Sequence, residues 1–106
     1  MNSVASAAFR TGSLLGGRHA TVGETKAQVL LDKNGQKVIF KTFRAGETMP
    51  THDAPVEVLV TVLTGRLNIT VEGATTELGT GDYIVFPAGA RHSLHCLDDA
   101  RILIYR

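Results

Sequence analysis

The stretch Gly81-Asp-Tyr-Ile-Val-Phe-Pro87-Ala-Gly89-Ala-Arg-His92 decides the fold of this 106-residue chain. It joins a short run of β-forming residues, 83–86, to a Pro-Ala-Gly turn and to a histidine that opens the next apolar segment. Aromatic and β-branched residues favour strands, whereas proline and glycine favour the turns between them. The stretch therefore predicts two short strands, 83–86 and 92–97, separated by a tight loop.

Short segments of the same kind continue on both sides of this stretch. Residues 27–32 and 36–44 flank Asn34-Gly35, a dipeptide typical of a two-residue hairpin turn. Further strands are predicted at 56–63, 66–72, 75–78 and 101–105, with breaks at Ala45-Gly46, Met49-Pro50, Thr64-Gly65 and Asp98-Asp99. About nine or ten short strands, with no helix after the N-terminal segment, predict an all-β sandwich or barrel.

Length and composition exclude several classes of protein. A chain of 106 residues supports one core, not separate cofactor and substrate domains. The 11 Lys and Arg residues nearly balance the 10 Asp and Glu residues, so we expect neither nucleic acid nor a membrane as partner. No apolar run approaches the roughly 20 residues that cross a bilayer. Cys96 is the single cysteine, which excludes an internal disulfide and leaves the cytoplasm as the expected location.

The first 23 residues differ in composition from the rest. They contain Arg10 and Arg18 but no acidic residue, and they are rich in Ser and Ala. This composition faintly resembles that of an organelle transit peptide, which is the alternative interpretation. We expect instead a structural N-terminal arm over residues 1–23 and a barrel domain over residues 24–106.

Four positions in the opening stretch carry a family resemblance. Gly81, Pro87, Gly89 and His92 fit G-x5-P-x-G-x2-H, the second motif of the cupin superfamily, which this sequence resembles over roughly residues 36–105. The family motif continues with Asn four residues after the His, where this chain has Cys96. The resemblance implies a double-stranded β-helix, or jelly-roll barrel, with a pocket between its sheets.

The first cupin motif, G-x5-H-x-H-x3-E-x6-G, is present in part. Gly46, His52 and Gly65 occupy its first glycine, first histidine and closing glycine in one register. Its second histidine position holds Ala54, and its glutamate position holds Val58. The metal-binding half of this motif is therefore incomplete.

Similar proteins with both motifs intact hold a divalent metal with three His and a Glu or Gln. Carried over position by position, the resemblance leaves only His52 and His92 as metal ligands, because Ala and Val offer no donor atom. Stable sites usually have three or four protein ligands. His95 should face away from His92, Cys96 should lie ~13 Å along the strand, and Glu57 is one residue out of register. We therefore expect either no resident cofactor or a weakly bound divalent metal.

The pocket implied by this register is mostly apolar. Its predicted lining is His52, Ala54, Val58, Val60, His92 and Leu94. Apolar walls with two imidazoles are typical of a small-molecule binding site. The alternative is a metal-dependent enzyme, of the dioxygenase or isomerase type, that uses both histidines as ligands. Metal-free catalysis with one histidine as general base is a third hypothesis, and the sequence leaves open whether the chain is an enzyme.

The predicted strand 56–63 is apolar on both faces. If Val58 and Val60 face the pocket, then Leu59, Thr61 and Leu63 face outward, where an antiparallel sheet is normally polar. We therefore predict that a second copy of the chain covers this face in a homodimer. Cover by the chain's own N-terminal arm is the alternative.

Overall fold

The computed structural model describes residues 9–16 and 27–106, so most of the predicted arm lies outside the described residues. The described part folds into strands and contains no helix that could cross a membrane. The strands are β2 (Ala27–Lys33), β3 (Gln36–Phe43), β4 (Thr48–His52), β5 (Val58–Val71), β6 (Ala74–Gly79), β7 (Tyr83–Phe86) and β8 (His92–Tyr105). The predicted all-β fold is confirmed.

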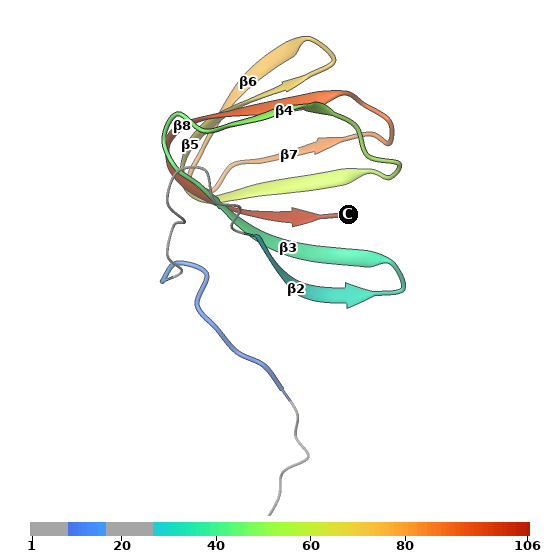
Figure 1. Ribbon diagram of the computed structural model, residues 1–106, viewed down its shortest axis with the longest axis vertical. Coiled ribbons are helices and arrows are strands. Elements are labelled where there is room, and N and C mark those ends of the chain that lie inside the picture. Colours follow the sequence, from blue (N-terminus) through green and yellow to red (C-terminus); the bar gives the residue numbers. More distant parts are fainter. Residues whose placement is uncertain (1–8, 17–26) are drawn as a thin grey trace, which may run out of the picture.

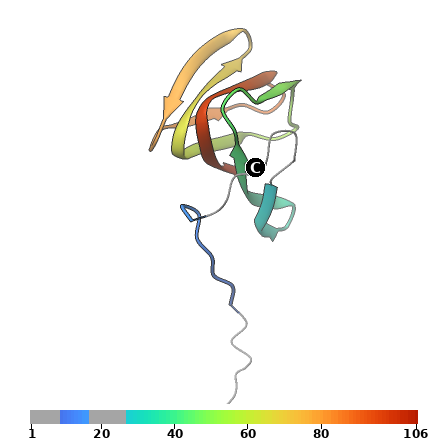
Figure 2. The ribbon, with the colours of Figure 1, turned by 60° about the vertical axis from the view of Figure 1, so that its left-hand side comes forward.

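Two long strands, β5 and β8, build the barrel because each takes part in both of its layers. The first half of β5 pairs with the second half of β8, and β7 and β3 extend this layer on either side. The second half of β5 pairs with the first half of β8, and β6 and β4 extend that layer. Figure 1 shows the hairpin β2–β3 and strand β6 at opposite edges, and Figure 2 shows how strongly the two long strands curve. The result is a jelly roll with its core between the layers.

A close approach at Gly65 marks the bend of β5. The β5–β8 register shifts between Val62 and Leu67, and Gly65 has a φ of 98°. A Cβ atom on Gly65 would lie 2.2 Å from the carbonyl oxygen of Asp99 and 2.6 Å from the Cα of Ala100. Breaks were predicted at 64–65 and 98–99, but these residues bend continuous strands instead of ending them. The described residues therefore form seven strands, fewer than the sequence indicated.

Two hairpins have the same type of turn. Asn34 and Gly35 have φ values of 53° and 81°, and Glu72 and Gly73 have values of 47° and 82°. Positive φ at both central residues defines the type I′ turn, whose twist matches that of the flanking strands. The predicted hairpin at Asn34-Gly35 is confirmed, and it joins β2 to β3.

Strand β4 runs through Met49-Pro50, where a break was predicted. Among the strands of residues 27–106 it pairs only with β8, with Met49 opposite Leu94 and His52 opposite His92. An edge strand tolerates proline because the missing N–H can lie on the side without a partner. The prediction of a break was therefore wrong, and for this reason the strand that carries His52 was not predicted.

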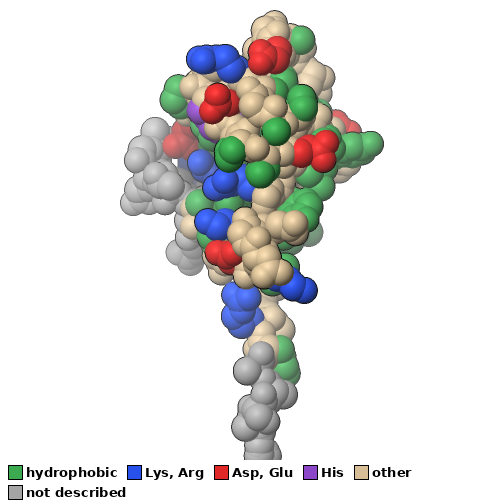
Figure 3. Space-filling model, turned by 90° about the vertical axis from the view of Figure 1, so that its right-hand side faces the viewer, with side chains coloured by type: hydrophobic (Ala, Val, Ile, Leu, Met, Phe, Trp, Pro, Cys, Tyr) green, Lys and Arg blue, Asp and Glu red, His purple; other side chains and the backbone are tan. Residues whose placement is uncertain are grey.

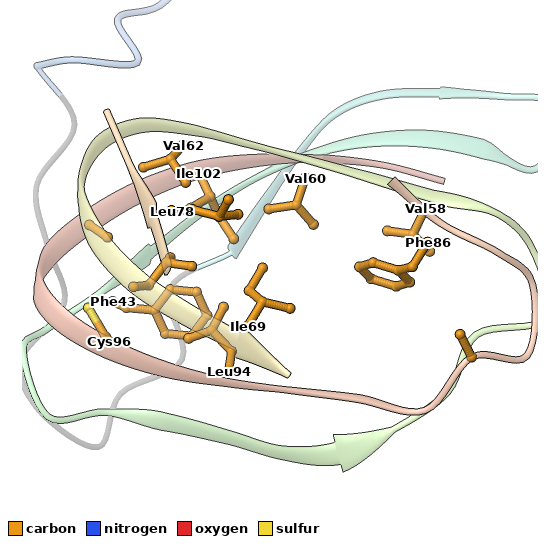
Figure 4. Packing of buried hydrophobic residues seen from close by; sticks show 13 residues of the cluster. Phe43, Val58, Val60, Val62, Ile69, Leu78, Phe86, Leu94, Cys96 and Ile102 are labelled. Atoms are coloured by element: carbon orange, nitrogen blue, oxygen red, sulfur yellow. The ribbon is translucent and has the colours of Figure 1, made fainter. Parts of the chain in front are cut away.

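The core consists of the side chains that point between the layers. Its buried members are Phe43, Val58, Val60, Val62, Leu67, Ile69, Leu78, Phe86, Ala90, Leu94, Cys96, Ala100 and Ile102. Figure 4 shows Phe43 and Cys96 toward one end of the cluster and Val58 and Phe86 toward the other. Val62, Leu67, Cys96 and Ile102 are the fully buried large side chains, so the barrel is most tightly filled around them.

The outer face of one layer carries an apolar row across five strands. Val85, Leu59, Tyr105, Val38 and Leu31 lie opposite one another in the register from β7 to β2. Val85, Tyr105 and Leu31 are each close to half exposed (48%, 45% and 50%). This is the face on which the homodimer was predicted. That assembly stays a prediction.

Charged side chains are spread over the surface. Figure 3 shows acidic and basic groups interspersed with hydrophobic ones on one face of the molecule. Arg66 on β5 links neighbouring strands, with its Nε 3.0 Å from Asp98 and its Nη1 3.4 Å from Glu77. The hydrogen bond to Asp98, followed by that to Glu77, raises the pKa of Arg66. Such exposed pairs contribute little to stability.

Candidate functional site

A cavity of about 260 Å³ lies between the two layers. The six residues that the sequence placed there all line it: His52, Ala54, Val58, Val60, His92 and Leu94. Val62 and Cys96 share the inward face with them but belong to the filled part of the core.

The remaining walls come from strands whose pairing the motifs do not specify. Ile69, Phe86, Ile102 and Ile104 add four large apolar side chains, and Met49 and Pro55 add two more. Val60 lies opposite Ile104 and next to Ile84 in the β-ladder, so strand pairing brings these side chains together. The alternation of Ile102 and Ile104 in the last strand was the signal that could have identified them.

Polar groups around the cavity are few. Besides the two histidines they come from Asp53, Ser93 and Arg106, of which Asp53 and Arg106 are exposed. A second, more polar hollow borders His92 and Ser93 and includes Thr51, Thr70 and Glu72. The enclosed part of the main cavity therefore presents hydrocarbon to any ligand, with imidazole as its main polar feature.

His52 and His92 form a close pair although forty residues separate them in the chain. They are register partners across β4 and β8, and directly opposed residues have neighbouring side chains. Their Nε2 atoms lie 2.9 Å apart, and the ring centroids are 4.1 Å apart with 63° between the planes. His92 is buried, whereas His52 is exposed on its other side.

The backbone fixes the hydrogen atoms of both rings. The Nδ1 of His52 lies 3.0 Å from the carbonyl oxygen of Pro50, and the Nδ1 of His92 lies 3.0 Å from that of Ala90. A carbonyl oxygen only accepts hydrogen bonds, so each Nδ1 must be the donor. In a neutral imidazole the other nitrogen, Nε2, is then an acceptor. The two Nε2 atoms lie at hydrogen-bonding distance from each other, 2.9 Å, so a hydrogen atom or a cation between them would satisfy both.

Neighbouring segments hold His92 in place. The backbone N–H of Arg91 donates to the Oε1 of Glu72 at 3.1 Å, and the N–H of Glu72 donates to the carbonyl of Arg91 at 2.8 Å. The Phe86 ring packs against the imidazole of His92 with 4.3 Å between centroids. Glu72 has a positive φ that non-glycine residues adopt rarely, and this clamp on Arg91 helps to stabilise it.

Most of the other side chains that could act as metal ligands lie away from the cavity. His95 and Glu57 are exposed and do not line the cavity, as their registers predicted, while Asp53 does line it. His19 lies outside the described residues. Cys96 is completely buried, and its Sγ donates to the carbonyl of Asp98 at 3.0 Å. Burial, followed by the charges of nearby acids, raises the pKa of this thiol to about 11, which keeps it protonated and unreactive.

The donor set does not match a complete metal site. Two imidazole nitrogens converge, but Ala54 and Val58 carry no donor atoms. Within residues 9–16 and 27–106 no three or more His, Cys, Asp or Glu side chains are grouped so that they could hold a metal ion. Because stable sites usually need three or four protein ligands, these residues do not fit a tightly held ion.

Comparisons with known proteins identify the family. Residues 39–105 match the family model of the cupin domain, which covers more than half of the chain. The chain therefore belongs to the cupin superfamily. No curated protein matches the sequence.

Solved structures agree with this fold. An RmlC-like cupin protein from Desulfovibrio desulfuricans superposes with a TM-score of 0.81 at 21% identity, covering 92% of this chain and 95% of its own. A Ralstonia eutropha protein, provisionally named a mannose-6-phosphate isomerase, superposes with a TM-score of 0.81 at 25% identity, covering 91% and 95%. The predicted cupin barrel is thereby confirmed.

Proposed function

We propose that this cupin is a cytoplasmic binding module that holds a small molecule in the apolar cavity beside His52 and His92. The observation that carries the proposal is a cavity of about 260 Å³ whose walls are mostly hydrocarbon, with the imidazole pair and Ser93 as polar groups and Asp53 and Arg106 exposed at its border. Ligand sites are typically concave and mostly apolar, with a few polar groups that fix orientation. The cavity lies just below the usual range of about 300–1,000 Å³, so the ligand is the size of a single ring.

Filling the cavity tests this function. Val60→Phe places extra atoms in the space beside Ile69 and Ile104, whereas Leu59→Phe makes the same kind of change on the opposite face of the strand. We expect toluene to bind the wild type and Leu59→Phe, and to lose binding in Val60→Phe, as measured by ligand-observed NMR. Unchanged binding by Val60→Phe, or none by the wild type at millimolar concentration, would argue against the cavity as a binding site.

A metal-dependent enzyme of the isomerase or dioxygenase type is the second candidate. The convergence of two Nε2 acceptors at 2.9 Å favours it, as does the name of the Ralstonia eutropha relative. The missing third and fourth donors argue against it. After dialysis without chelator, we expect elemental mass spectrometry to find far less than one transition metal per chain. A full equivalent would make this candidate the better one.

Restoring the two absent donors provides the companion test. Ala54 and Val58 both line the cavity, so Ala54→His with Val58→Glu should bring four donors together. We expect this double variant to bind a divalent metal more tightly than the wild type in a competition assay with a chelating dye. No gain in affinity would contradict the register that assigns these positions to the pocket.

We also propose that a second copy of the chain packs on the outer apolar row. This row crosses five strands and includes Leu59, Tyr105 and Val85. A twofold contact brings the same patch of two subunits together, and an apolar sheet face can be self-complementary. The oligomeric state in solution tests this assembly.

A further inference from the structure

We infer that the ligand of this cavity is a small amphipathic acid, with an apolar body between the two layers and a carboxylate that pairs with Arg106 at the border of the cavity. This inference rests on the proposed binding function and adds the chemical class of the ligand. Its basis is the position of an exposed arginine side chain beside mostly apolar walls.

The end of β8 directs Arg106 to the cavity side of the barrel. Ile102, Ile104 and Arg106 follow one another at every second position and all three line the cavity, because alternate side chains of a strand share a face. The backbone of Arg106 is anchored to Lys37 on β3: its N–H donates to the Lys37 carbonyl at 3.0 Å, and its carbonyl accepts from the Lys37 N–H at 2.6 Å. The side chain therefore extends from a fixed point at the border between cavity and solvent.

The guanidinium of Arg106 is available to a ligand. It forms no ion pair within residues 9–16 and 27–106, in contrast to the guanidinium of Arg66. Asp53, the acidic residue at the same border, follows β4, which belongs to the other layer, and it does not pair with Arg106. A carboxylate suits this guanidinium because its two oxygens match the paired N–H donors of arginine.

The walls select the rest of the ligand. Val60, Ile69 and Leu94 line the cavity with side chains that offer no hydrogen bond. A hydroxyl on the body of the ligand would be buried against them without a partner, at a loss of about five- to 150-fold in affinity. The volume of about 260 Å³ suits a body of one ring. Phenylacetate is a simple acid of this class, because one methylene group separates its ring from its carboxylate.

A series of ligands that differ in charge tests the inference on the full chain after treatment with chelator. Phenylacetate, 2-phenylacetamide and benzylamine carry an anionic, a neutral and a cationic group on the same benzyl body, and NMR titration gives their dissociation constants.

We expect Arg106→Gln to weaken phenylacetate binding about two- to fivefold, the range of an exposed ion pair, and to leave toluene binding unchanged. About 0.5 M NaCl should weaken phenylacetate binding to the wild type in the same way, because salt screens an exposed pair. Arg91→Gln is the matched control: Arg91 is also exposed, but it borders the second, more polar hollow and not the main cavity, so this variant should bind phenylacetate like the wild type.

The outcomes separate the ligand class from the binding function. If Arg106→Gln leaves phenylacetate binding unchanged, or weakens toluene binding as much, the pairing with Arg106 is overturned and the apolar cavity stays in place. Benzylamine binding more tightly than phenylacetate would also overturn the acid, because the charged group would then pair with Asp53. Phenylacetate binding that appears only after a divalent metal is added would overturn it as well. Failure of every compound, toluene included, would overturn the binding function itself.

Discussion

The close approach at Gly65 can be tested by adding a single methyl group. Gly65→Ala places a Cβ 2.2 Å from the Asp99 carbonyl oxygen and 2.6 Å from the Ala100 Cα, both of them backbone atoms that cannot rotate away. The residue must also keep a φ of 98°, which costs a side-chain-bearing residue about 1–3 kcal/mol. Separating β5 from β8 to relieve the overlap costs about 1–3 kcal/mol more, as overpacking does elsewhere.

The matched control is Gly46→Ala. Gly46 has a similar φ of 90°, but its Cβ would meet no atom within 4 Å. This variant should therefore lose only the stability that a positive φ costs a residue with a side chain. Urea unfolding followed by far-ultraviolet circular dichroism suits a chain without tryptophan. With an m-value of about 1–2 kcal/mol/M, the extra cost of about 1–3 kcal/mol should place the midpoint of Gly65→Ala about 0.5–3 M below that of Gly46→Ala. Equal midpoints would refute the close crossing of the two long strands.

Three further predictions concern the core and the outer face. Because burial raises the pKa of Cys96 to about 11, its reaction with iodoacetamide at pH 8 should be far slower in the native protein than in urea, and rapid native alkylation would contradict this. The free energy of unfolding should also fall between about pH 9 and 11, where the thiol ionises only in the unfolded chain. The Oγ1 of Thr42 is buried with no hydrogen-bond partner among the described residues, so Thr42→Val should be neutral or stabilise by about 1 kcal/mol in urea unfolding. Thr70→Val, which removes a hydroxyl 2.7 Å from that of Thr75, should be the more destabilising of the two, and the reverse order would show that Thr42 is satisfied. Replacing Leu59 and Leu63 with lysine should convert a dimer to the 11.3 kDa monomer by light scattering, whereas a monomeric wild type would exclude the dimer.

Much of the fold could be predicted from the spacing of glycine, proline and histidine, because these residues act within short stretches of the sequence. Asn34-Gly35 predicted its hairpin, since few residues adopt positive φ at both turn positions. The register of the two motifs assigned His52 and His92 to one pocket, and the structure places them opposite each other on paired strands. Period-two alternation then predicted that Val58 and Val60 face inward.

The rest depends on contacts between distant parts of the chain. The residues at Gly65 have the composition of a turn, and only the packing against β8 shows that they bend a strand instead. Pro50 indicates a break until β4 is seen to have a single partner strand, β8, among the described residues. The Nδ1 bonds to the Pro50 and Ala90 carbonyls depend on local backbone geometry, which residue spacing does not specify.

The central claim is that a small ligand occupies the cavity between the layers and touches the histidine pair. NMR of the chain labelled in its methyl groups and histidine rings, titrated with toluene, locates the ligand directly. We expect chemical-shift changes in the methyl groups of Val60, Ile69, Leu94, Ile102 and Ile104, which line the cavity, and in the imidazole signals of His52 and His92. The methyls of Leu59, Leu63 and Leu103 should stay unchanged. Changes on those outward leucines without changes in the cavity, or no change at millimolar toluene, would contradict the account.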